Sequence, residues 1–490
     1  MPPLRASAQP PPFSWTEAFR LRSDRMTPSA PTLPLAAALM LTLSLGFGSS
    51  CAPPLPSDAE VEAVRDAQSA AALPDGPPNI VLVLVDQLRK DSFDSWAPEL
   101  SALAAKGWVA DEMRSVAPWT YPSVVSLMSG LYPQQHGADG HPESNALTVF
   151  DERVPLLQKQ LKEQDYSTAA FVTNPFLHVW NRFHEGFDTY DIHFVGNQGA
   201  VRRGAGGVPD GRDALDMAQV WMPDRFADSV NASVMQHYAE APPAGPEFTY
   251  VHYIDVHGPW EGAPFDGGYQ ASIRYTDAKV VELYEHFMER YDGDLVFVVT
   301  SDHGRSIGQD EKVGDGPRYR VNKKSVHEFN LRIPFVVLPS KRVTEPGVVR
   351  AACSNVDVVP TLLEMVGIDA PIPLPGRSLL ADFRGEQELD DSDRALYARH
   401  SAFGHQSDCI VWRGQKYMRL YDQGSRKVGA RRIFELVEDP TEEHSLGDSF
   451  GDAETLLLKA AGNHGQFFPT SYEELSSDVE EKLRALGYLK

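Results

Sequence analysis

The sequence has few cysteines. Only Cys51, Cys353 and Cys409 occur in 490 residues, too few for a disulfide framework or for a zinc site built from several thiolates. Cys51 follows an apolar run near the N-terminus. The other two could form one disulfide in an oxidising compartment or remain as two buried thiols, and no spacing rule decides between these alternatives.

Basic residues are scarce relative to acidic ones. The chain contains 45 Lys and Arg against 68 Asp and Glu, which gives a formal net charge of −23. Such a charge repels the phosphate backbone of nucleic acids at long range. We also find no internal repeat and no basic patch rich in aromatic residues, so the sequence argues against nucleic acid as a partner.

The sequence also lacks an apolar run of the roughly 20 residues that span a bilayer as a helix. The run at residues 33–47 has the length of a signal-peptide core, and the following Gly48-Ser-Ser-Cys51 is similar to a bacterial lipobox, with Gly48 in place of the usual Leu. We expect an exported protein, held on a membrane surface by a lipid on Cys51 in the periplasm or on the outer surface of a bacterium. The alternative is a cleaved secretory signal without lipid. Translation could begin at Met26, which would remove the basic residues upstream of the run.

Two apolar runs end abruptly on side chains that bind metals. Residues 79–85 lead to Asp86, and residues 295–300 lead to Asp302 and His303. Such runs are typical of buried parallel strands, whose carboxyl ends meet where open α/β sheets bind ligands. A single acid there would more often cap a helix or pair with an arginine. Because two strands match, we predict that Asp86, Asp302 and His303 form a metal site.

The third element of the predicted site is a short helix. Residues 120–130 begin with Thr120, have Pro122 in the first turn and stop at Gly130. Thr120 therefore lies at a helix N-terminus, where free N–H groups and the helix dipole favour a bound anion. A lone threonine there would ordinarily be an N-cap. Beside a cation, which lowers the pKa of a hydroxyl and neutralises ester oxygens, it is a nucleophile for a phosphate or sulfate ester.

Six ordered segments resemble the sulfatase-like branch of the alkaline phosphatase superfamily. They are the two metal strands, the Thr120 helix with the following residues up to 137, and residues 253–259, 356–368 and 433–443. The likeness runs from about residue 78 to about residue 446. It implies an α/β fold in which a mostly parallel sheet is sandwiched by helices and followed by a small antiparallel sheet with a helix. It also implies an ester hydrolase that forms a covalent intermediate.

The departures from this family carry as much information as the matches. The sulfatase signature Cys/Ser-x-Pro-x-Arg, whose first residue becomes formylglycine, is here Thr120-x-Pro122-x-Val124, and Thr120 cannot be converted in that way. Residues 171–174, Phe-Val-Thr-Asn, replace the Gly-Lys-Trp-His segment that contacts sulfate, and Gln87 stands where many sulfatases have another metal-binding Asp. Members with a threonine nucleophile mostly act on phosphoesters or transfer phospho groups, so the resemblance favours phosphate over sulfate.

The resemblance also assigns residues that contact the substrate. His257, after the expected strand at residues 248–254, either binds the substrate and protonates the leaving oxygen or is a loop histidine bonded to backbone. Lys323 falls where the family has a lysine on the anionic group, although an ordinary surface lysine explains it nearly as well. Asp255, His257 and His327 could hold a second metal. Two-metal relatives, however, usually space that Asp and His more widely than Asp255-Val-His257.

We expect four segments along the chain. Residues 1–51 are the export signal, 52–77 a flexible tether rich in Ala, Pro and Asp, 78–385 the catalytic domain and 386–490 a C-terminal subdomain. The length and the 42% hydrophobic content suffice for this arrangement. The expected elements are strands at 167–172, 248–254, 295–300, 333–338, 409–412 and 416–421, and helices at 154–163, 277–289 and 477–486.

These observations predict an exported hydrolase of an anionic ester. One divalent ion, Ca²⁺, Mg²⁺, Mn²⁺ or Zn²⁺, is expected between Asp86, Asp302, His303 and the Thr120 oxygen. Two other functions use the same fold. One is an envelope phospho-group transferase, which usually carries several membrane helices that this chain lacks, and the other is a catalytically inactive binding protein.

Overall fold

The computed structural model describes residues 74–141, 146–177, 181–192, 226–239, 245–258, 268–307, 325–390, 393–402, 405–463 and 468–473. All of them belong to one compact unit of the chain that begins at Ser50. The expected signal, residues 52–73 of the tether, Lys323 and the expected helix at 477–486 lie outside the described residues, and the proposed segment boundaries stay predictions.

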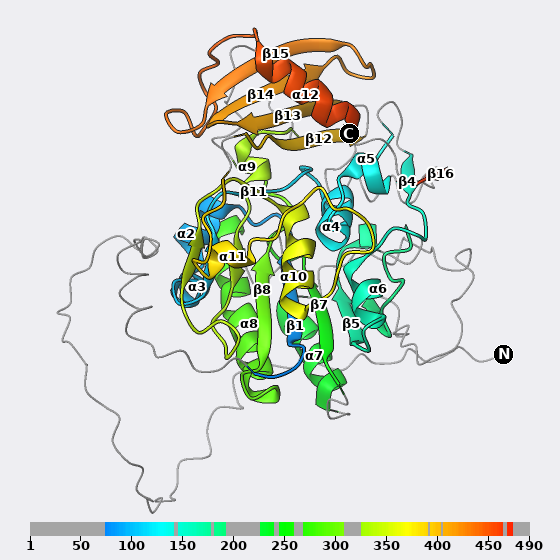
Figure 1. Cartoon of the computed structure of the whole chain (residues 1–490), viewed down its shortest axis with the longest axis vertical. Helices are drawn as coiled ribbons and strands as arrows, with labels where there is room; N and C mark the ends of the chain where they lie inside the picture. The colour runs from blue at the N-terminus through cyan, green and yellow to red at the C-terminus, as the bar shows by residue number, and fades with distance from the viewer. Residues whose placement is uncertain are drawn as a thin grey trace, which may run out of the picture. The chain divides into compact units, whose positions relative to one another are not determined.

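The central sheet has eight strands in the order β10-β2-β9-β8-β1-β7-β5-β6. Its middle strand β1 pairs in parallel with β7 and β8, and the sheet lies among helices in Figure 1. Every β1 residue from Ile80 to Val85 is at most 1% exposed, as expected for a parallel strand covered on both faces. The strands are β1 (Asn79–Val85), β2 (Trp108–Ala110), β5 (Ser167–Val172), β6 (Thr189–Ile192), β7 (Glu247–Tyr253), β8 (Leu295–Thr300), β9 (Phe335–Val337) and β10 (Gly347–Val349).

Alternate side chains of β1 enter two hydrophobic cores. Leu82 and Leu84 pack in the core that contains residues of helices α4, α6 and α10. Val81 and Val83 pack in the core with residues of α2, α3, α7 and α8. This two-sided packing confirms the predicted fold class. The helices are α2 (Lys90–Trp96), α3 (Pro98–Ala104), α4 (Thr120–Ser129), α6 (Leu157–Lys162), α7 (Ala227–Ala239), α8 (Gly268–Arg290) and α10 (Val358–Val366).

Two expected elements differ from the structure in length or direction. Helix α8 begins at Gly268, nine residues before the expected start, because buried Tyr269, Ser272, Ile273 and Thr276 continue its helical spacing. Strand β9 covers only three of the expected residues and runs antiparallel to both β8 and β2. An apolar run carries no information about strand direction, so the sequence could not predict that reversal.

The predicted C-terminal antiparallel sheet is also confirmed. Its four strands follow the order β12-β13-β14-β15, and α12 packs on β13. Their bounds are β12 (Leu396–Ala402), β13 (His405–Trp412), β14 (Gln415–Tyr421), β15 (Val428–Glu435) and α12 (Asp452–Asn463). The remaining elements are β3 (Met113–Arg114), β4 (Leu147–Val149), β11 (Cys353–Ser354), β16 (Ser471–Glu473), α5 (Pro133–His136), α9 (Glu328–Leu331), α11 (Leu380–Phe383) and the 3₁₀ turns η1 (Pro175–Leu177) and η5 (Asn355–Asp357).

The two cysteines of the folded part do not pair. Cys353 in β11 and Cys409 in β13 are both free and buried. Burial raises the pKa of each thiol, so both behave as small apolar side chains. In the part of the chain that the structure describes, no helix combines the length and apolarity needed to cross a bilayer.

A group of buried charges joins the C-terminal sheet to the catalytic domain. Lys416 of β14, with no exposed side-chain area, places its Nζ 2.9 Å from Oε1 of both Glu328 and Glu442. Arg114 of β3 contacts the other oxygen of Glu328 at 2.9 Å, and Glu442 accepts the N–H of Glu328 at 2.6 Å. Burial opposes the charge of Glu328, but Arg114 and Lys416 outweigh it and lower its pKa to about 2. We call Arg114, Glu328, Lys416 and Glu442 the buried charge cluster.

Candidate functional site

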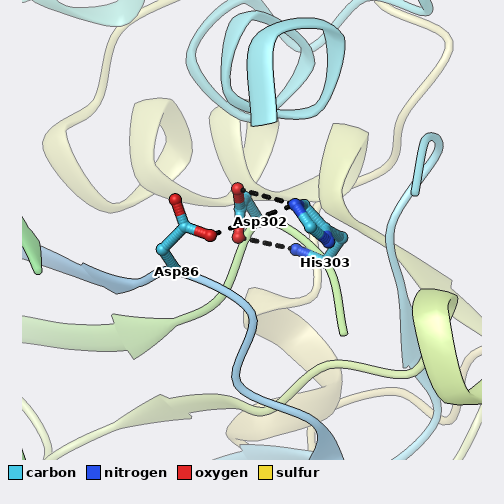
Figure 2. Close-up of side chains that lie close together, drawn as sticks. All are labelled: Asp86, Asp302 and His303. Atoms are coloured by element: carbon cyan, nitrogen blue, oxygen red, sulfur yellow. Dashed lines mark hydrogen bonds and ion pairs between the residues drawn. The ribbon is translucent and has the colours of Figure 1, made fainter. Parts of the chain in front are cut away.

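Three of the predicted metal-binding side chains lie together. Strands β1 and β8 are neighbours, with Leu84 opposite Thr300, so Asp86 and Asp302 emerge side by side at their carboxyl ends. One ligand atom from each of Asp86, Asp302 and His303 lies within 4.8 Å of the others. Figure 2 shows these three side chains close together. All three are buried, with exposed fractions of 0 to 3%.

The free oxygens of this group point to a cation. Oδ1 of Asp302 accepts hydrogen bonds from the N–H groups of Gln87 at 3.2 Å and His303 at 2.8 Å. The other oxygen, Oδ2, lies 3.4 Å from His303 Nε2. Among the described residues, Asp302 Oδ2 and Asp86 Oδ1 have no hydrogen-bond partner. Burial and the charge of Asp302 raise the pKa of Asp86 well above its ordinary value. Two buried carboxylates and an imidazole therefore fit a divalent metal ion, which would satisfy both oxygens.

Thr120 lies against these side chains. It is the first residue of α4, whose C-cap Gly130 has a φ of 70°, the left-handed backbone that favours glycine at this position. The Thr120 side chain is fully buried. Its Oγ1 is 3.4 Å from Asp86 Oδ2 and 3.5 Å from His303 Nε2. The hydroxyl that the sequence singled out thus faces the group that can hold a metal.

Asn174 is a site residue that the sequence reasoning missed. It follows β5, and its Nδ2 donates to Asp86 Oδ2 at 2.6 Å and to Thr120 Oγ1 at 3.4 Å. Its own Oδ1 accepts the N–H of Phe176 at 2.9 Å, which fixes the direction of the amide. The available signal was its position after a third buried strand, at the point where sulfatases have their Lys-containing segment.

His257 also lies near the group. Its Nδ1 is 3.0 Å from the carbonyl oxygen of Gly258, and its side chain is buried. Burial, and then the positive charges of Arg305 and His303, lower the pKa of His257 to about 3. The imidazole is therefore neutral near pH 7 in this structure, and an anionic substrate would oppose that shift. A role in substrate binding or leaving-group protonation stays a prediction.

The residues considered for a second metal are engaged elsewhere. Asp255 Oδ1 accepts the N–H of Ala227 at 2.9 Å. His327 Nδ1 is 2.7 Å from Ser325 Oγ, and its ring stacks on Phe329. Within the described ranges, Asp86, Asp302 and His303 form the only group of three or more metal-binding side chains with ligand atoms this close.

His136 has a structural role, and its burial leads to a pH prediction. Its Nε2 is 2.9 Å from Ser126 Oγ, and its Nδ1 accepts the N–H of Ala138 at 2.9 Å. Burial lowers its pKa from 6.5 to about 3. Below pH 6.5 the unfolded chain therefore binds a proton at His136, and the native protein does not. The stability that His136 contributes above pH 6.5 is consequently lost as the pH falls towards 3.

We expect the share of His136 in this loss to be about 2 kcal/mol at about pH 5. Urea unfolding of the wild type and His136→Leu at neutral pH and at about pH 5 measures it. The difference in the free energy of unfolding between the two pH values should be smaller in the variant by this amount. An equal loss in both proteins would contradict the assignment.

Two carboxylates and an imidazole lie at the ends of parallel strands, next to the hydroxyl of a residue that begins a helix. This arrangement is typical of ester hydrolases of the sulfatase and alkaline phosphatase class. The family model described as Sulfatase matches residues 78–368. A second, described as N-sulphoglucosamine sulphohydrolase, C-terminal, matches residues 318–457. The chain belongs to the sulfatase family, and it is a sulfatase-like ester hydrolase.

Individual relatives cover most of the chain. The low-salt glycan biosynthesis sulfotransferase Agl7 of Haloferax volcanii is 23% identical over 456 residues, 84% of this chain and 96% of the relative. The crystal structure of Ps i-CgsB has a TM-score of 0.59 at 19% identity and covers 84% of this chain and 98% of its own. The phosphonate monoester hydrolase SpPMH of Silicibacter pomeroyi has a TM-score of 0.57 at 15% identity, with coverage of 79% and 95%. The structural likenesses show the fold.

Proposed function

We propose that this protein is a metal-dependent hydrolase of phosphate esters that uses Thr120 as its nucleophile. The observation that carries the proposal is the position of Thr120 Oγ1, 3.4 Å from Asp86 and 3.5 Å from His303. Beside it lie two buried carboxylate oxygens that make no hydrogen bond to the described residues. A divalent cation held by Asp86, Asp302 and His303 would lower the pKa of the Thr120 hydroxyl and neutralise the ester oxygens.

The chain's own residues supply the remaining steps. Thr120 Oγ1, which donates its proton towards Asp86 Oδ2, attacks phosphorus in line, and the bond to the leaving alcohol oxygen breaks. Asn174 Nδ2 and the N–H groups at the start of α4 stabilise the charge on the ester oxygens. His257 would take up a proton when a bound anionic substrate opposes the lowering of its pKa, and would then give that proton to the leaving oxygen. Water then cleaves the bond between phosphorus and Thr120 and releases phosphate.

Phosphate is preferred over sulfate because Thr120 cannot become formylglycine and because Asn174 replaces a basic residue of the sulfatases. The phosphonate monoester hydrolase SpPMH, which has a similar fold, is consistent with this preference. Group transfer is the second candidate function. It is favoured by the similarity over 96% of Agl7, whose name describes a sulfotransferase, and it shares the first half-reaction, since an acceptor alcohol would replace water.

A panel of esters tests the proposal. Purified protein, stripped of metal with a chelator and reloaded with Ca²⁺, Mg²⁺, Mn²⁺ or Zn²⁺, is incubated with an aryl sulfate, a phosphate monoester and a phosphodiester. Metal-dependent release of the alcohol from a phosphate ester is expected. Turnover of the sulfate alone would reverse the preference for phosphate. Product formation only with an added acceptor alcohol would establish the transferase, and metal binding without any turnover would favour a binding protein.

Arg305 is proposed to bind the substrate anion. Its NH1 donates to the carbonyl of His257 at 2.8 Å, its guanidinium carbon lies 5.4 Å from the centre of the Tyr269 ring, and Arg89 donates to its carbonyl at 3.3 Å. These contacts hold the guanidinium beside His257. Burial and Asp302 raise the pKa of Asp86, and the positive charge of Arg305 opposes that rise, so the charge of Arg305 acts on the metal-binding group.

We expect Arg305→Gln to lower kcat/KM by about 10–100-fold, mainly through KM, because a charged hydrogen bond to the substrate is lost. Steady-state kinetics with a phosphate monoester measures the effect, and Arg305→Lys should retain part of the activity. Arg274, an exposed arginine of α8, provides the matched control Arg274→Gln, which should behave as the wild type. Unchanged KM in Arg305→Gln would remove Arg305 from the substrate site.

We also propose that the protein is exported and anchored by a lipid on Cys51. The apolar run at residues 33–47 and the Gly48-Ser-Ser-Cys51 sequence support this. The full-length chain should fractionate with membranes, and Cys51→Ser should release it. Equal distribution of both proteins in the soluble fraction would contradict the anchor.

A further inference from the structure

His252 is a buried histidine whose ring makes no hydrogen bond to any of the described residues. It lies on β7 opposite Leu84 of β1, and the alternation of strand side chains therefore turns it towards the face of the sheet that α4 covers. Its exposed fraction is 0%. Neither ring nitrogen has a hydrogen-bond partner within the described part of the chain. A buried polar group in this state is costly, so the imidazole needs a function that compensates for the cost.

The polar group beside His252 is the carboxylate of Asp86. Nε2 of His252 is 3.7 Å from Asp86 Oδ2, and neither side chain is exposed. The backbone at this point is fixed, because the Thr173 hydroxyl donates to the carbonyl of His252 at 2.7 Å. Roughly 0.5–1 Å of approach would bring the imidazole and the carboxylate to hydrogen-bond distance.

The two oxygens of Asp86 have different surroundings. Oδ2 accepts from Asn174 at 2.6 Å and from Thr120 at 3.4 Å. Oδ1, which has no hydrogen-bond partner, lies 4.0 Å from His303 Nε2. One oxygen is therefore surrounded by donors, while the other is left for a cation. His252 is on the side of the donors.

We propose that His252 is a positioning residue for the metal ligand Asp86. With the proton on Nε2, its ring donates to Asp86 Oδ2 when a divalent ion is bound, and together with Asn174 it keeps Oδ1 directed at the ion. His252 is not itself a ligand, because the compact group of ligand atoms comprises Asp86, Asp302 and His303. The inference rests on the metal site of the proposed function. Loss of such a partner of a metal ligand weakens metal binding by about 10–100-fold.

His136 supplies a matched control, since it is equally buried but fully bonded. Both of its nitrogens have partners at 2.9 Å, so it stabilises the fold whether or not a metal is present. Removing the ring of His252 takes away a polar group that makes no hydrogen bond to the described residues, which costs little in the metal-free protein. The two histidines should therefore respond in opposite ways to the same substitution.

The experiment uses the full-length protein stripped with a chelator. Zn²⁺ and Mn²⁺ dissociation constants are measured by competition with a chromophoric chelator, and the Tm of the metal-free proteins is measured by calorimetry. His252→Leu should weaken metal binding about 10–100-fold with an unchanged or higher metal-free Tm. His252→Gln, whose amide can donate to Asp86, should recover part of the affinity. His136→Leu should lower the metal-free Tm and leave metal affinity unchanged.

Two results would overturn the inference separately from the proposed function. Wild-type metal binding with equal affinity in His252→Leu would remove His252 from the metal site and leave the proposed metal centre intact. A metal-free Tm lowered as much as in His136→Leu, with unchanged affinity, would make His252 an ordinary core residue. If the wild type binds neither ion, the metal centre and this inference both fail.

Discussion

Thr120→Ala should abolish ester hydrolysis, with kcat/KM lowered by at least about 10³-fold. The reason is that Thr120 Oγ1 is the proposed attacking atom, beside Asp86 and His303. Removing it leaves the charged groups of the site in place, so metal binding should survive. Thr120→Ser keeps the hydroxyl on a less restricted side chain and should retain part of the rate.

Ser129 provides the control for Thr120 in the same helix. It is equally buried, but its hydroxyl donates to the carbonyl of Val125 at 2.6 Å, within α4 and away from the proposed chemistry. Ser129→Ala should therefore change kcat/KM little. Turnover of a phosphate ester by Thr120→Ala at the wild-type rate, with metal bound, would contradict the nucleophile. Trapping a phosphorylated Thr120 by acid quench would support it directly.

Lys416→Met should destabilise the protein by about 3–5 kcal/mol. Lys416 is the ammonium group between Glu328 and Glu442, and neither carboxylate is more than 6% exposed. Removing the cation leaves one of the two buried carboxylates without a counter-charge, while Arg114 still partners Glu328. The loss is read from the midpoint and slope of urea unfolding followed by circular dichroism.

Lys427 separates the effect of burial from that of losing a lysine. Its side chain is 81% exposed, and its Nζ lies 3.9 Å from Asp422, so Lys427→Met should change stability by no more than about 0.5 kcal/mol. Equal effects of the two substitutions on the free energy of unfolding would show that Lys416 in the buried charge cluster contributes no more to stability than an exposed lysine. Mutating Glu442 to Gln together with Lys416→Met should recover part of the loss, because fewer unpaired charges remain.

The central residues of the candidate site could be predicted because each of them lies in a segment with a recognisable local sequence pattern. Asp86 and Asp302 interrupt apolar runs that are recognisable without any partner strand, and Thr120 opens a helix with an early proline and a glycine stop. The structure brings all three together with His303. The parallel sheet and the C-terminal antiparallel sheet followed from the same kind of periodicity.

Other side chains near the candidate site could not be predicted from local sequence patterns. His252 stands inside a buried strand, and only the pairing of Leu84 with His252 places its ring beside Asp86. Asn174 follows β5, which is separated from β1 by β7 in the sheet, so its approach to Thr120 depends on strand order. The reversed direction of β9 likewise depends on a connection whose path the apolar pattern does not encode.

The buried charge cluster has a consequence for biosynthesis. Glu328 meets Lys416 and Glu442 only after a further 88 and 114 residues have been added. While the ribosome is still making the last quarter of the chain, Glu328 has Arg114 as a counter-ion but does not yet have its contacts with Lys416 and Glu442. The catalytic half should therefore reach its final stability late, when the polypeptide is nearly complete, and a prematurely terminated product should be a target for proteolysis.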